Sequence, residues 1–65
     1  MTSKEARNIK TQLWVSYQLI EDLQDDYPES VSINLATEKI RDINILVSNF
    51  FEGMIFDDQK VSIKP

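Results

Sequence analysis

The sequence lacks cysteine and histidine, and its 65 residues include one glycine and two prolines. Without cysteine there is no disulfide and no thiolate metal site. A single glycine excludes glycine-rich phosphate-binding loops, and nucleophilic catalysis has no histidine or cysteine to use. We therefore expect a protein that is not an enzyme and that binds no cofactor and no metal.

The chain also lacks length and long apolar runs. A domain of this size buries only about 60% of the surface that its unfolded chain exposes, so it needs a disulfide, a metal or a second chain for stability. Because the composition excludes a disulfide and a thiolate metal site, a second chain is the remaining source of stability. The residues after Met1 are polar, so we expect no signal peptide, no membrane span and a cytoplasmic location.

Positive charge is scarce, and the net charge is −4. An acidic chain is a poor general nucleic-acid binder, because such binding comes mostly from neutralising phosphates. The charges are unevenly spread. Residues 21–29 contain five acids and no base, whereas residues 1–10 contain Lys4, Arg7 and Lys10 against one acid.

The first half of the chain has the apolar pattern of a heptad stripe, with apolar residues at alternating steps of three and four. This stripe contains Ala6, Ile9, Leu13, Ile20, Leu23 and Tyr27, with Ser16 as its polar member. Thr2 or Ser3 can cap the start of a helix, and Pro28 disfavours helical geometry at the residue before it. We predict a helix over about 3–26 and a turn over about 27–30.

A second heptad stripe follows the turn. It contains Ile33, Ala36, Ile40, Ile43, Val47, Phe50 and Met54. Several of these residues are β-branched, but a three/four spacing kept over three heptads outweighs their strand propensity. Gly53 can end the helix. We predict a helix over about 31–53 and a short C-terminal tail over about 57–65.

The two stripes fit one antiparallel hairpin. In such a hairpin, the residue numbers of facing pairs add to a constant, and one register satisfies this condition along both stripes. The facing pairs include Leu13–Val47, Ile20–Ile40, Ile9–Phe50 and Leu23–Ala36. We therefore predict an all-α fold in which a single helical-hairpin domain covers residues 1–65.

The second predicted helix is too apolar for a lone hairpin, because Leu35, Leu46 and Phe51 flank its stripe. Two hairpins packed face to face form a four-helix bundle that buries such a wide apolar face. We therefore predict a homodimer with coiled-coil-like packing. Its core is expected to contain Ile9, Leu13, Ile20, Leu23, Ile40, Ile43, Val47 and Phe50.

Trp14 lies off the stripe of its helix, about 130° from the stripe centre. Arg7, Lys10 and Gln18 share its face, and Ile45 is the matching off-stripe residue of the second helix. An exposed indole beside two bases is typical of a protein-binding hot spot or of a nucleic-acid stacking platform. Alternatively, Trp14 packs at the bundle edge with Lys10 over its ring. These five residues are the candidate partner-binding residues.

The segment 50–56 contains five apolar residues, more than one helical stripe can bury. Either the chain turns at Gly53 and folds Ile55 or Phe56 back over the open end of the bundle, or this cluster is a docking surface.

Three functions follow in order of preference. The first is a small regulatory or accessory protein that binds itself and another protein. The second is an RNA-binding hairpin dimer with a basic end formed by Lys4, Arg7, Lys10, Lys60 and Lys64. Nucleic acid is therefore a possible but less favoured partner.

The third is a magnesium-dependent enzyme similar to all-α nucleotide pyrophosphohydrolases, which hold the ion with helical carboxylates. Carboxylates at spacing of four would supply the oxygen ligands that Mg²⁺ prefers. The candidates are Glu21, Asp22, Asp25, Asp26, Glu38 and Asp42. The first four lie on the solvent side of their helix, away from the seam, so this site is the least favoured.

Overall fold

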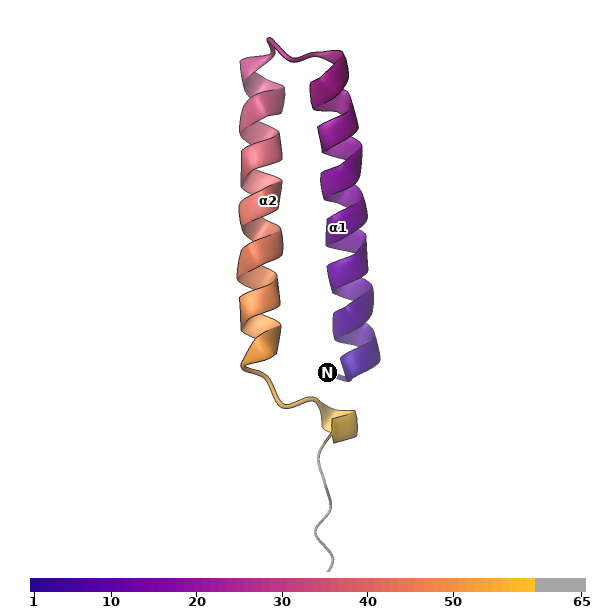
Figure 1. Ribbon diagram of the computed structural model, residues 1–65. Helices are drawn as coiled ribbons and strands as arrows, with labels where there is room; N and C mark the ends of the chain where they lie inside the picture. Colours follow the sequence, from indigo (N-terminus) through magenta and orange to yellow (C-terminus); the bar gives the residue numbers. More distant parts are fainter. Residues whose placement is uncertain (60–65) are drawn as a thin grey trace, which may run out of the picture.

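The computed structural model describes residues 1–59, which form an antiparallel pair of helices (Figure 1). Helix α1 spans Ser3–Asp26 and helix α2 spans Val31–Glu52, and a short 3-10 helix, η1, covers Asp57–Gln59. This part of the chain contains no strand. The predicted all-α hairpin is confirmed. The rest of the predicted tail, with Lys60 and Lys64, lies outside the described residues.

Polar side chains cap the start of both helices. Thr2 and Glu5 form a capping box, in which the Thr2 hydroxyl accepts from the Glu5 amide at 3.2 Å and the Glu5 carboxylate accepts from the Thr2 amide at 3.2 Å. The Ser30 hydroxyl accepts from the Ile33 amide at 3.3 Å. These contacts satisfy amide groups that have no partner within the helix.

Both helices end at residues that disfavour a further helical turn. The last turn of α1 closes with a bond from the Tyr27 amide to the Leu23 carbonyl, just before Pro28. Gly53 caps α2 with a φ of −86°, so it ends the helix without the left-handed conformation that glycine often supplies.

The seam between α1 and α2 is partly polar. The Asn44 amide group donates to the Leu13 carbonyl of the other helix at 3.1 Å, and the Gln24 amide group donates to the Asn34 side-chain oxygen at 2.9 Å. The buried and half-buried seam residues include Ala6, Leu13, Tyr17, Ile20 and Gln24 on α1, and Ile33, Thr37, Ile40, Asn44, Val47 and Phe51 on α2. Within the two helices, the seam therefore contains every second member of each predicted stripe, such as Leu13 and Ile40. At most of the remaining stripe positions, the residue that follows takes part in the seam instead, such as Tyr17 after Ser16 and Asn44 after Ile43.

Three of the four residues in the predicted pairs Ile9–Phe50 and Leu23–Ala36 are exposed in the hairpin, and Ala36 is half-buried. Ile9, Leu23, Ile43 and Phe50 are 37%, 43%, 43% and 62% exposed. One neighbouring helix covers only a narrow strip of the stripe. The contact is turned towards Thr37 and Asn44, whose polar groups bond to the carbonyls of Ile33 and Ile40 at 2.9 and 2.8 Å.

The C-terminal segment folds back over the open end of the hairpin. Phe51 is buried, and the ring of Phe56 lies 6.0 Å from it between ring centroids. Ile55 remains 75% exposed. The chain thus turns after Gly53 and Phe56 folds back over the end of the hairpin, while Ile55 stays outside.

Acidic residues of η1 contact the start of α1. The Ser3 amide donates to the Asp58 carboxylate at 2.8 Å, and the Ser3 hydroxyl donates to its second oxygen. These hydrogen bonds from Ser3 hold the pKa of Asp58 below its ordinary value of 3.8. The carboxylate thus satisfies an amide in the first turn of α1, where negative charge is stabilised by the helix dipole.

Candidate protein-binding surfaces

The exposed members of the heptad stripes lie on a single face of the hairpin. On α1, Ile9 and Leu23 each precede by one residue a position that faces α2. On α2, Ile43 and Phe50 each precede by one residue a position that faces α1. One residue is a rotation of about 100°. Because the helices are antiparallel, the same backward rotation carries both rows to the same side. We call this side the apolar face.

The apolar face is wide. Its exposed residues are Ile9, Leu19, Leu23, Ile43, Leu46 and Phe50. Between them, half-buried side chains reach from the seam towards the same side, namely Leu13, Ile20, Ile40 and Val47. These two groups include all eight residues predicted for the dimer core, so these residues share one face.

The hairpin buries few side chains on its own. In the described part of the chain only Ala6, Thr37 and Phe51 are buried, and no large side chain is fully enclosed. Since apolar burial is the main favourable term in folding, most of the apolar area that could stabilise this chain still contacts water.

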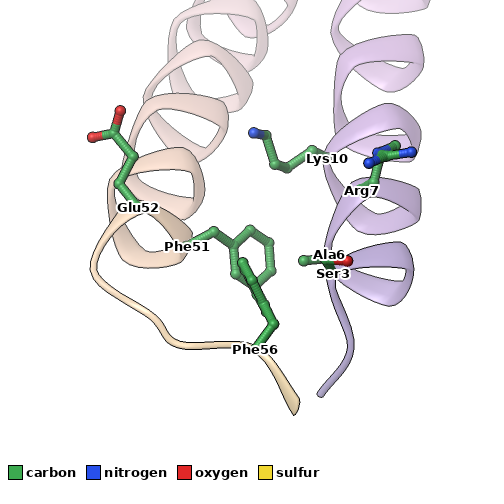
Figure 2. Close-up of a pocket in the computed structure, with 7 residues that line it drawn as sticks. All are labelled: Ser3, Ala6, Arg7, Lys10, Phe51, Glu52 and Phe56. Atoms are coloured by element: carbon green, nitrogen blue, oxygen red, sulfur yellow. The ribbon is translucent and has the colours of Figure 1, made fainter. Parts of the chain in front are cut away.

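The opposite side of the hairpin carries a shallow groove along the two helices. At the open end, Ser3, Ala6, Arg7, Lys10, Phe51, Glu52 and Phe56 line a first hollow. In Figure 2 the Lys10 side chain extends from α1 towards α2, above the two phenylalanine rings. Two further hollows continue along the groove, lined by Thr11, Trp14, Asn44, Ile45, Ser48 and Asn49 as well as Arg7 and Lys10.

Trp14 and Ile45 meet in this groove although they come from different helices. Trp14 is 54% exposed, and its nearest ring is Tyr17, with centroids 5.5 Å apart. A hydrogen bond with Glu21 is the main cause that raises the pKa of Tyr17 above its ordinary value of 10.0. The groove therefore offers an exposed aromatic side chain from α1 and an aliphatic side chain from α2.

Two cations stand at one end of the groove. Arg7 and Lys10 are exposed, and neither takes part in a salt bridge within residues 1–59. Gln18, the remaining predicted residue, is exposed but lines none of the hollows. The structure thus brings four of the five candidate residues to one groove and leaves the fifth outside it.

Asn44, Ser48 and Asn49 line the groove but were not predicted. They are small polar residues whose role depends on the exact rotation of α2 about its axis, which the apolar pattern does not define. The signal that could have found them is position, since Ser48 comes one residue after Val47 of the stripe, as Trp14 comes one residue after Leu13.

The carboxylates considered for magnesium do not converge. Within residues 1–59, no group of three or more acidic, histidine or cysteine side chains is placed to hold a metal ion. Neither helix of this region has the length and apolar content needed to cross a bilayer.

Comparison of the chain with protein-family models, with curated proteins and with solved structures gives no significant match.

Proposed function

We propose that this chain is a non-enzymatic accessory or regulatory protein of the cytoplasm, which forms a homodimeric four-helix bundle and binds another protein through its outer groove. The single observation that carries the proposal is the division of the hairpin into an uncovered apolar face and an opposite groove lined by Trp14, Ile45 and two cations. The first side suits a second copy, and the second suits a different partner.

The size of the apolar face supports the first contact. Helix α1 has 24 residues and is about 36 Å long. Two helices packed 8–10 Å apart present a face about 20 Å wide, or about 700 Å². Stable protein–protein interfaces bury about 600–1,000 Å² per partner. One face of this hairpin is therefore large enough for a dimer.

The direction of the stripes supports the same contact. In a four-helix bundle each helix has two neighbours, and its apolar stripe faces the bundle centre between them. On both helices the predicted stripe extends from the seam to the apolar face, through Ile20 to Leu23 on α1 and through Ile40 to Ile43 on α2. A second hairpin on this face completes such a core.

The groove supports a protein partner. Trp14 offers a large apolar area whose loss on binding costs little side-chain entropy, and tryptophan and arginine are enriched among residues that dominate binding energy. Ile45 completes the apolar part, while Arg7 and Lys10 favour a partner that carries carboxylates beside its apolar anchor.

The basic end proposed for RNA binding is weaker than the sequence alone suggests. Asp57 and Asp58 lie against the start of α1, where the Asp57 amide donates to the Met1 carbonyl and Asp58 accepts from Ser3, the residue before Lys4. These acids offset part of the positive charge there. RNA binding depends steeply on such charge, so a protein partner is favoured over RNA.

Trp14→Ala tests the partner site. The purified tagged protein captures its partner from the source cells, and the partner is then purified and titrated against the protein while Trp14 fluorescence is followed. We expect Trp14→Ala to keep its helicity and dimer mass while binding weakens at least about thirtyfold, equivalent to about 2 kcal/mol. The matched control is Val31→Ala, which truncates an apolar residue that is 79% exposed and lines none of the groove hollows.

Two results would contradict the site. Equal loss of binding in both variants would show that the groove is not the partner-binding site. Loss of folding in Trp14→Ala, with blue and protected emission in the parent protein, would show that Trp14 belongs to a core. A salt-dependent gel shift with RNA that requires Arg7 and Lys10 would instead favour the RNA-binding alternative.

A further inference from the structure

We infer that the two copies pack head to tail, so that the turn of each hairpin lies beside the open end of the other. The inference rests on the dimer proposed above and concerns the same apolar face. Two arrangements bring two such faces together with antiparallel helix neighbours. In one, α1 packs on α1 of the second copy. In the other, both turns lie at the same end, and α1 packs on α2 of the second copy.

The acidic turn region separates the two arrangements. Five acids and no base lie in residues 21–29, around the turn: Glu21, Asp22, Asp25, Asp26 and Glu29. With both turns at one end, ten carboxylates would be crowded together. Like charges at short distance destabilise an interface, and orientation is one of the properties that charge patterns select. The head-to-tail arrangement keeps the two clusters a helix length apart.

The open end of the hairpin carries charge of the opposite sign. Residues 1–10 contain Lys4, Arg7 and Lys10 against one acid, Glu5. Head-to-tail packing places this end of each copy beside the acidic turn region of the other copy, whereas turns at one end would bring the two basic ends together as well. Charge complementarity between the two ends therefore favours the head-to-tail arrangement.

Head-to-tail packing also defines the outer surface of the assembly. The two Trp14 grooves face outwards on opposite sides of the bundle, and the Arg7 and Lys10 ends of the grooves lie at opposite ends of it. One dimer thus offers two equivalent sites and can hold two partner molecules that point in opposite directions.

A pulsed spin-label distance measurement tests the orientation, because the absence of cysteine allows a single label at any position. Glu29→Cys places the label at the turn. We expect a distance of about 40 Å between the labels of a head-to-tail dimer, set by the helix length. A distance of about 10–20 Å, set by helix spacing, would overturn the inference.

Gln18→Cys is the control, since it lies near the middle of α1 and gives a distance of about 20–35 Å in either arrangement. Coupling at Gln18 with a short distance at Glu29 overturns the orientation alone and leaves the dimer. No coupling at either position removes the dimer itself. As a second measurement, Lys4→Glu is expected to raise the dimer dissociation constant about two- to tenfold, and an unchanged constant would contradict the pairing of the basic end with the acidic turn region.

Discussion

The seam inside the hairpin and the apolar face beside it differ in what they bury. The seam includes Thr37, Asn44 and Gln24, which form hydrogen bonds, with partly covered aliphatic residues between them. The apolar face contains no comparable polar row, yet Phe50 and Leu46 on it are 62% and 66% exposed. The more apolar of the two surfaces is the one that the single chain leaves uncovered.

This difference suggests that the two surfaces contribute differently to alignment and to stability. Hydrogen bonds across the seam fix how the two helices align, because each polar group has few acceptable partners. The apolar face has little directional preference but a large area, and area supplies most of the stability. A hairpin built in this way is well defined but weak until its face is covered.

The largest expected effect comes from truncating the apolar face. Ile43→Ala is expected to destabilise the dimer by about 2–5 kcal/mol, because Ile43 is buried once a second copy covers it. Ile45→Ala is the control, since this residue lies two positions away on the groove side and should cost no more than about 0.5 kcal/mol. Chemical denaturation of both variants measures the difference. Equal losses would mean that the two faces do not differ in the way described.

A smaller effect is expected in the seam. Asn44→Ala removes the bond to the Leu13 carbonyl, and we expect a loss of about 0.5–1.5 kcal/mol. Asn49→Ala, at an exposed position of the same helix, is the matched control and should change stability by less than about 0.5 kcal/mol. If Asn44→Ala matches Ile43→Ala in the denaturation experiment, the seam supplies as much stability as the apolar face.

The smallest effect is expected at the open end, which belongs to neither surface. Hydrogen bonds from Ser3 lower the pKa of Asp58 in the folded state. Their stabilising contribution is therefore present above the ordinary pKa of the carboxyl and is lost as the pH falls through the lowered value. An NMR titration of the Asp58 carboxyl carbon should show this low pKa, and Ser3→Ala should move it back part of the way. A midpoint at the ordinary value in both proteins would show that the contact between Ser3 and Asp58 does not form.

The sequence predicts the hairpin well because the periodicity, the caps and Pro28 all indicate the same two helices. The position of the seam could not be predicted, because an apolar stripe that faces the centre of a bundle packs against two neighbouring helices. Its period does not say which edge packs against the helix of the same chain. That choice depends on contacts between the helices such as the bond from Asn44 to the Leu13 carbonyl, which become visible only in three dimensions.

The candidate site shows the same limit. The sequence singles out Trp14 and Ile45 as apolar residues off their stripes, and the structure brings them into one groove. It could not indicate that Gln18 lies outside the groove, or that Asn44 and Ser48 line it. Those placements depend on the rotation of each helix by a few tens of degrees. Partner binding by these residues remains a prediction.

The account depends most on the claim that a second copy covers the apolar face. Sedimentation equilibrium at micromolar concentration, combined with thermal unfolding over a hundredfold dilution series, tests this directly. The chain has a mass of 7.6 kDa. We expect a species of twice this mass and a melting temperature that falls on dilution, because folding and assembly are coupled by mass action. A 7.6 kDa monomer with the same melting temperature at every concentration would contradict the account.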